Sequence, residues 1–176
     1  MKKLSMAGLG RKSIEEFKQT SKIPIVIVLD NLRSQHNIGS AFRTTDAFLP
    51  EGIYLCGITA TPPNKEIHKT ALGAEDSVFW RYFTRTEDAV RELKENNYTI
   101  ISIEQVEQSI SLTDFQPEKN HKYALIFGNE VKGVDQNIVD NSDLCIEIPQ
   151  SGTKHSLNVS VSIGIVLWDI INKIGQ

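Results

Sequence analysis

The sequence of 176 residues contains little cysteine or histidine, with two residues of the first type and four of the second. Their spacing matches no metal site, so we expect no metal. Cys56 and Cys145 lie in apolar, strand-like runs, which favours buried free thiols in a reducing cytoplasm over a disulfide. The longest uncharged run near the C-terminus, 156–168, has 13 residues, whereas a membrane span needs roughly 20. We therefore expect a cytoplasmic protein with no membrane partner.

The chain also lacks the glycine-rich loops of common nucleotide-binding domains. A Rossmann dinucleotide site carries G-x-G-x-x-G after its first strand. Here the apolar run 25–29 is followed by residues 30–39, which contain one glycine, and no P-loop or G-x-S-x-G motif is present. If a cofactor binds, the ends of the last two predicted strands are the available places.

Charge is unevenly distributed along the chain, whose formal net charge is −3. Residues 1–22 contain six lysines and arginines but only two glutamates. Such a basic arm can bind phosphate groups locally even when the whole protein is acidic; the alternative is a solvated tail. We divide the chain into a basic N-terminal arm (1–22) and one folded domain (23–176).

Apolar runs suited to strands alternate with amphipathic segments suited to helices, which predicts an α/β fold. We expect a mostly parallel six-stranded sheet with helices on both faces. Residues 104–121 are predicted to form a long loop. Ser13 and Glu16 fit a capping box, and Asn37 is a candidate helix cap. The predicted strands are 25–29, 53–58, 78–83, 98–103, 123–127 and 144–148, and the predicted helices are 14–20, 38–48, 65–72, 86–97, 134–141 and 157–174.

A first polar constellation follows the first predicted strand. Asn37, if it caps the helix, directs free N–H groups toward the preceding loop, which favours an anion site. Gly39, Arg43 and Asp46 share one helical stripe. Arg33 and Arg43 are suited to bidentate contacts with phosphate groups. The alternative is that Arg43 and Asp46 form a structural ion pair and Asn37 serves only as a cap.

A second constellation, Gly128-Asn129-Glu130-x-x-Gly133, follows the buried run 123–127. Glycines on both sides of an acidic residue suit a tight turn where the backbone approaches a ligand. Glu130 is open to three interpretations: a ligand contact, a residue that positions other polar groups, or a solvated loop charge.

The third constellation is the segment from Ile148-Pro149 through Ser156-Leu157-Asn158-Val159-Ser160 into the closing helix. Ser156, Ser160 and Gly164 recur every four residues and form a face of small side chains. The rest of the helix is almost free of charge, so it must be buried over most of its circumference. Its apolar surface suits the core of the domain or a subunit interface.

In this order and spacing, the three segments, together with Leu72-Gly73-Ala74-Glu75, resemble the SpoU (TrmH-like) branch of the SPOUT RNA methyltransferases over about residues 24–174. The resemblance implies a Rossmann-like fold with a deep C-terminal trefoil knot. It also implies S-adenosylmethionine as cofactor, a homodimer formed through the C-terminal helix, and methyl transfer to a ribose 2′-hydroxyl of RNA. A tRNA substrate is favoured over rRNA, because minimal members of the family commonly act on tRNA.

Carried over by position, the resemblance also implies the site residues. Backbone groups are expected to make much of the cofactor contact. The resemblance implies that Arg43 assists as the base, with a phosphate held nearby. Because an arginine stays charged far above neutral pH, the alternative is that Arg43 stabilises the developing alkoxide and holds phosphate while another group takes the proton. The general base is therefore not identified. The catalytic residues would be Asn37, Arg43, Glu130, Ser156 and Asn158; the cofactor-binding residues Ile103, Glu104, Gly128, Ile148 and Leu157; and the RNA-binding residues Arg11, Lys12, Arg33, Arg43 and Lys154.

Two other classes of protein remain open on the sequence. A non-catalytic dimeric RNA-binding protein that retains the knotted fold would not bind S-adenosylmethionine. A flavodoxin-like module for another small ligand would have an unknotted C-terminus.

Overall fold

A computed structural model describes residue 3 and residues 10–175 of the chain. Residues 1–2, 4–9 and 176 are not described, so Lys2 of the predicted basic arm lies outside the described residues.

A seven-stranded sheet forms the centre of the molecule, in the order β3-β2-β1-β6-β4-β7-β5. All neighbouring strands are parallel, so their carboxyl ends meet at one edge of the sheet. The strands are β1 (Ile23–Asp30), β2 (Pro50–Cys56), β3 (Trp80–Phe83), β4 (Thr99–Ile103), β5 (Ile110–Ser111), β6 (Tyr123–Phe127) and β7 (Leu144–Glu147).

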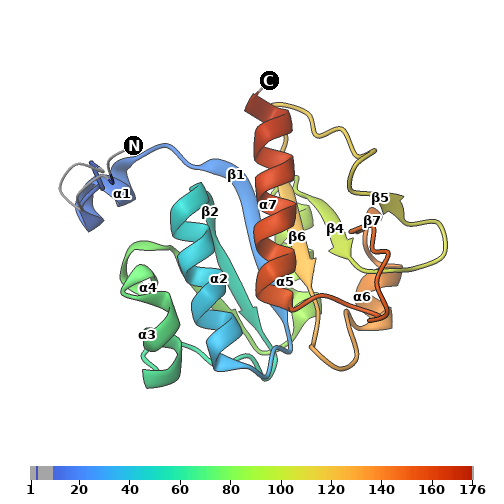
Figure 1. Cartoon of the computed structure of the whole chain (residues 1–176), viewed down its shortest axis with the longest axis horizontal. Helices are drawn as coiled ribbons and strands as arrows, with labels where there is room; N and C mark the ends of the chain where they lie inside the picture. The colour runs from blue at the N-terminus through green and yellow to red at the C-terminus, as the bar shows by residue number, and fades with distance from the viewer. Residues whose placement is uncertain (1–2, 4–9, 176) are drawn as a thin grey trace.

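Helices cover both faces of the sheet, as the sequence predicts. They are α1 (Ile14–Gln19), α2 (Gln35–Phe48), α3 (Lys65–Ala71), α4 (Ala74–Ser77), α5 (Thr86–Glu95), α6 (Gln136–Asp140) and α7 (Val159–Gly175). Figure 1 shows α2 and α7 side by side in front of the sheet, where they contact each other.

The central strand β1 shows why its run of β-branched residues forms a strand buried on both sides. Ile25, Ile27 and Leu29 pack with residues of α2 and α7, whereas Val26 and Val28 pack with α5 and α6. Alternate residues of a strand point to opposite faces, so one apolar run contributes to two separate cores.

The predicted number of six strands is wrong, because β5 adds a seventh. This strand has two residues and lies in the segment 104–121 that the sequence predicts as a loop. Its partner is β7, where Ile110 pairs with Ile146 and Ser111 with Glu147. So short an edge strand has no periodic pattern of its own.

Three predicted helix starts are also wrong, and among them α6 begins at Gln136 rather than at residue 134. Helix α2 is capped by Ser34, whose Oγ accepts from the N–H of Asn37 at 3.3 Å. Helix α7 starts at Val159 rather than at Leu157, and Asn158 Oδ1 accepts from the N–H of Ser160 at 2.9 Å. The predicted capping box of Ser13 and Glu16 at the start of α1 is confirmed.

Both cysteines are free, as expected. Cys56 is buried, and burial, aided by the nearby charge of Asp30, raises the pKa of its thiol to about 12. Cys145 is only half-buried. Within the described residues, no helix has the length and apolar content to cross a membrane.

Candidate active site

The loop after β6 closes on itself in a tight turn. The N–H of Asn129 donates to the carbonyl of Gly133 at 2.9 Å, and the N–H of Gly133 donates back to the carbonyl of Asn129 at 2.8 Å. A Cβ on Gly128 would lie 2.1 Å from the carbonyl carbon of Gly133, so only glycine allows this approach. The Asn129 amide donates to the carbonyl of Asn31 at 2.7 Å, which ties the turn to the loop after β1.

Glu130 makes the second connection between these two loops. Its carboxylate accepts from the N–H groups of Arg33 and Ser34, both at 3.0 Å, and from Asn37 Nδ2 at 3.1 Å. Partial burial by itself raises the pKa of Glu130, but the hydrogen bonds from these groups outweigh it and leave the pKa below its ordinary value. Of the three interpretations, the geometry supports a residue that positions other polar groups.

Asn37 extends this network to the start of α7. Its Oδ1 accepts from Asn158 Nδ2 at 3.2 Å. Asn158 Oδ1 in turn accepts from the N–H and the Oγ of Ser160, at 2.9 and 2.6 Å. The chain Glu130–Asn37–Asn158 therefore joins the loop after β6, the first turn of α2 and the loop after β7, which are far apart in sequence.

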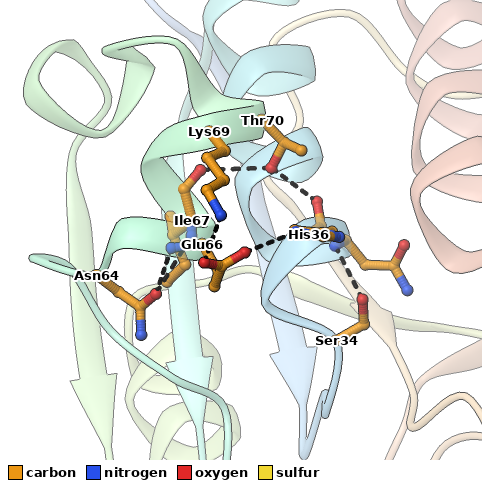
Figure 2. A network of polar contacts seen from close by, with 8 residues as sticks. Ser34, His36, Asn64, Glu66, Ile67, Lys69 and Thr70 are labelled. Carbon is orange, nitrogen blue, oxygen red and sulfur yellow. Dashed lines mark hydrogen bonds and ion pairs between the residues drawn. The ribbon is translucent and has the colours of Figure 1, made fainter.

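Helix α3 supports the N-terminal part of α2 from the side, as Figure 2 shows. Glu66 pairs with His36 Nε2 at 3.0 Å, and Thr70 Oγ1 donates to the carbonyl of His36 at 3.0 Å. Gly39 permits this contact, because a Cβ there would lie 2.1 Å from Thr70 Oγ1 and 2.3 Å from the carbonyl oxygen of Ile67. Gly39 therefore serves the packing of α2 against α3.

A cavity of about 590 Å³ opens at the carboxyl ends of β4, β6 and β7. Ligand pockets usually have volumes of about 300–1,000 Å³. Glu130, Ser156 and Asn158 line this cavity. All five residues expected to bind the cofactor line it as well: Ile103, Glu104, Gly128, Ile148 and Leu157.

Glu104 has a structural partner within the cavity wall. Its carboxylate accepts from the N–H of Val134 at 2.9 Å and from the N–H of Gln105 at 3.0 Å. Gly133 lies so close that a Cβ would come within 2.1 Å of Glu104 Oε2. These contacts hold the end of β4 against the turn after β6.

Arg43 lies apart from this cavity. It lines a second cavity of about 520 Å³, together with Arg11 and Lys12. Among the described residues it forms no ion pair with Asp46, which instead accepts from Ser77 Oγ at 2.7 Å. The structural-pair alternative is therefore wrong, and within one chain Arg43 is not brought together with the other expected catalytic residues.

The remaining expected RNA contacts lie near the first cavity without lining it. Arg33 and Lys154 are both exposed. The backbone N–H of Arg33 is held by Glu130, which leaves its guanidinium at the surface next to the loop network.

Sequence reasoning missed Asp30, which ends β1 and is only 1 % exposed. Its carboxylate accepts from Thr86 Oγ1 at 2.5 Å, from Asn31 Nδ2 at 2.8 Å and from the N–H of Asp135 at 3.1 Å. It therefore anchors the loop network to the opposite layer of helices. An aspartate at the end of a fully apolar strand is the signal that could have identified it.

His155 is a second residue that sequence reasoning missed. It lines the first cavity directly before the Ser156-Leu157-Asn158 segment.

In the described part of the chain, no group of three or more histidine, cysteine, aspartate or glutamate side chains is arranged to hold a metal ion.

Comparison with known proteins gives this site a family. Residues 24–168 match the SpoU rRNA Methylase family, and the chain belongs to it. One relative is a protein of Staphylococcus aureus (strain MSSA476) that carries the name of a TrmH family tRNA/rRNA methyltransferase. It is 27% identical over 161 residues, which cover 91% of this chain and 63% of the relative, so the chain spans less than two thirds of its length. An uncharacterized tRNA/rRNA methyltransferase of Borreliella burgdorferi is 32% identical over 157 residues, covering 89% of this chain and 67% of the relative.

Solved structures show the same fold. The A. aeolicus TrmH/SpoU tRNA modifying enzyme superimposes with a TM-score of 0.80 at 25% identity, covering 91% of this chain and 80% of that one. An S-adenosylmethionine-bound rRNA methyltransferase from Sinorhizobium meliloti has a TM-score of 0.77 at 25% identity, covering 90% of this chain and 60% of that one. The α/β fold expected from the sequence is therefore that of SPOUT methyltransferases.

Proposed function

We propose that this chain is an S-adenosylmethionine-dependent RNA methyltransferase that methylates a ribose 2′-hydroxyl. The observation that carries the proposal is the convergence of three loops, after β1, β6 and β7, beside one cavity. Glu130 and Asn158 line that cavity, and Asn37 joins them by hydrogen bonds to both. The proposal is consistent with membership of the SpoU family.

The cavity wall suits the cofactor. Ile103, Ile148 and Leu157 offer apolar surface to an adenine ring, and Gly128 brings its backbone to the same cavity wall. Glu104 would place negative charge near the cationic groups of the cofactor. When bound, S-adenosylmethionine supplies a methyl group made electrophilic by its positively charged sulfur.

The polar network then positions the RNA. Glu130 fixes Asn37, and Asn37 fixes Asn158, whose amide lines the cavity where a ribose would lie. Ser156 supplies a further hydroxyl at the same cavity. Holding a hydroxyl within reach of a reactive carbon can lower a barrier substantially without any further chemistry.

Basic side chains would hold the rest of the RNA. Arg11, Lys12 and Arg43 line the second cavity, and Arg33 and Lys154 are exposed near the first. Contacts of this kind bind phosphate groups without reading sequence. In this proposal residues 1–22 act as an RNA-binding arm and residues 23–176 as the catalytic domain.

We favour tRNA over rRNA as the substrate. The A. aeolicus TrmH/SpoU tRNA modifying enzyme, which superimposes with a TM-score of 0.80 at 25% identity, supports this preference. The proposed place of action is the cytoplasm, where such RNA is found.

A homodimer through α7 is part of the proposal. Val161, Ile165 and Trp168 expose apolar surface on this helix, with Val161 49% and Trp168 62% exposed. Ile165 and Trp168 also border an apolar groove of about 510 Å³. Clustered apolar surface on one helix commonly marks an interface, and a second copy of the same chain would bury it symmetrically.

We also propose that the C-terminal part of this chain forms the deep trefoil knot that the family resemblance implies.

The test is methyl transfer from labelled S-adenosylmethionine to total RNA, followed by nucleoside analysis. We expect label in tRNA as a 2′-O-methylnucleoside. Label on a base would refute the ribose assignment, and label in rRNA alone would refute the tRNA preference. Binding of RNA without detectable binding of cofactor in calorimetry would instead identify a non-catalytic RNA-binding protein.

A further inference from the structure

Among the described residues, four side-chain hydrogen bonds join the turn after β6 to the segment that runs from β1 into α2, and three of them end on Glu130. The fourth comes from Asn129, whose Nδ2 donates to the carbonyl of Asn31 at 2.7 Å. Asn129 lines the first cavity next to Glu130, although the sequence gives it no catalytic or binding role. An inference about its role in methyl transfer rests on the proposed function.

The turn after β6 is held together by bonds of its own. Asn129 Oδ1 accepts from the N–H groups of Val131 and Lys132, at 2.9 and 3.3 Å. A side-chain oxygen that accepts from the N–H two residues further on closes an Asx turn. The backbone groups of Asn129 and Gly133 also bond to each other in both directions. The shape of the turn therefore does not depend on Asn31, and the Asn129 amide nitrogen is left to determine where the turn lies.

The carbonyl that receives this bond is itself held in place. Asn31 has a left-handed φ of 55°, a conformation that asparagine adopts more readily than most residues. Its N–H donates to the carbonyl of Cys56 at 3.2 Å, and its Oδ1 accepts from the N–H of Ile58 at 3.1 Å. Its Nδ2 donates to the buried carboxylate of Asp30 at 2.8 Å. Asn129 therefore docks the turn on a point that is fixed against the end of β2 and the sheet.

We propose that Asn129 is a positioning residue, which sets where Glu130 meets the loop after β1 and the first turn of α2. Glu130 directly follows Asn129, so a shift of the turn moves the Glu130 carboxylate relative to its three donors. The shift passes through Asn37 to Asn158 at the cavity. Both ends of the Asn129 amide are bonded within the protein, so it acts through Glu130. All these bonds lie within one chain, so the role holds whichever copy of a dimer supplies Arg43.

The test begins with Asn129→Ser in the full-length protein. A serine hydroxyl can still close the turn by accepting from the N–H two residues on, but it is one bond shorter than the amide and does not span the gap to Asn31. The substitution changes no charge, and Asn129 is only half-buried, so the variant should remain folded. Asn137→Ser is the matched control, because it removes an amide bond from Asn137 Nδ2 to Glu87 at 3.2 Å, between α6 and α5.

The first readout is single-turnover methylation of purified total tRNA with labelled S-adenosylmethionine. At saturating cofactor and tRNA, we expect Asn129→Ser to lose about tenfold or more in rate, because a small displacement of positioning groups can cost up to about 100-fold. The tRNA concentration for half-maximal rate, and the affinity for S-adenosylhomocysteine in calorimetry, should change less than about threefold, since binding groups are retained. Asn137→Ser should stay within about twofold of wild type in all three quantities.

The second readout requires no activity. Burial by itself raises the pKa of Glu130, and the hydrogen bonds from its donors outweigh burial and leave the pKa below its ordinary value. If Asn129 positions this carboxylate, Asn129→Ser should raise the pKa of Glu130 toward the ordinary value in an NMR titration. Asn137→Ser should leave it unchanged, because a loss of overall stability alone does not move this pKa.

The double variant Asn129→Ser/Glu130→Gln separates positioning from an independent role. Once Glu130→Gln has disturbed the contact, Asn129→Ser should lower the rate by less than about threefold more, because residues that act through one another are not additive. A further loss as large as that of Asn129→Ser alone, a rate of the single variant within about twofold of wild type, or an unmoved Glu130 pKa would overturn the assignment. A wild-type protein that methylates no RNA would refute the proposed function, while the pKa of Glu130 would still decide whether Asn129 positions it.

Discussion

Replacing Glu130 with glutamine tests how the three loops of the site are held together. In the structure, Glu130 Oε2 accepts from the N–H of Arg33, and Oε1 accepts from the N–H of Ser34 and from Asn37 Nδ2. Glutamine keeps the size of the side chain but replaces one oxygen with an NH₂ group. In either orientation of the amide, at least one hydrogen bond is lost and two donors face each other.

The magnitude follows from the number and exposure of these bonds. A hydrogen bond to a charged group contributes about 1.5–3 kcal/mol. Glu130 lies at the surface, where solvent weakens such bonds, so we expect a loss of about 1 kcal/mol. In a domain of this size, 1 kcal/mol lowers Tm by about 2–4 °C.

The pH dependence gives the same variant a second signature. The pKa of Glu130 is lower in the folded chain than its ordinary value of 4.5. The resulting stabilisation is present above that ordinary value and is lost as the pH falls through the lowered folded value. The difference in Tm between wild type and Glu130→Gln should therefore shrink as the pH falls below 4.5.

The assay is thermal unfolding followed by circular dichroism between pH 3 and 8, with S-adenosylhomocysteine binding measured in parallel at pH 7. Glu95→Gln is the control, because it makes the same change in charge at the exposed end of α5. Equal Tm values for the two variants at pH 7 would contradict this role of Glu130. A Tm deficit of Glu130→Gln that grew as the pH fell would contradict it as well.

Three other changes have equally specific outcomes. Gly39→Ala should cost about 1–3 kcal/mol through overpacking against α3, whereas Gly164→Ala, with no atom within 4 Å of the new Cβ, should not destabilise the fold in thermal melts. Arg43→Ala should abolish methyl transfer but leave S-adenosylhomocysteine binding intact in calorimetry; retained transfer would refute its role. Trp168→Glu should convert the proposed dimer to a monomer in light scattering, whereas Ile58→Glu, at an equally exposed apolar position in the turn after β2, should not.

The sequence predicts those parts of the fold that depend on local pattern. The buried run 25–29 and the amphipathic segment 86–97 correspond to β1 and α5 because side-chain periodicity records burial directly. The cap of α2 could not be predicted in this way. Ser34 and Asn37 are both good caps three residues apart, and only the contacts of Asn37 with distant residues leave the capping role to Ser34.

The site shows the same division between local and long-range information. Gly128, Ile148 and Leu157 follow or flank strands that end at one edge of a parallel sheet, so their meeting around one cavity follows from topology. Arg43 and Gly39 share a helical stripe with Asp46, but helical spacing does not determine which neighbour that stripe faces. The structure places Gly39 against α3 and Arg43 beside the N-terminal segment.

The position of Arg43 connects two parts of the proposal that are otherwise separate. Phe48, at the end of the helix that carries Arg43, packs edge-on against Trp168 of α7 with ring centroids 6.1 Å apart. A second copy docked on the exposed side of α7 would therefore border the end of α2 as well. Within one chain, Arg43 lines the second cavity, whereas Glu130, Ser156 and Asn158 line the first. One chain alone therefore does not bring all the expected catalytic groups together. If dimer formation completes the site, Trp168→Glu should lose methyl transfer while its monomer still binds S-adenosylhomocysteine. A fully active monomer would show that one chain suffices.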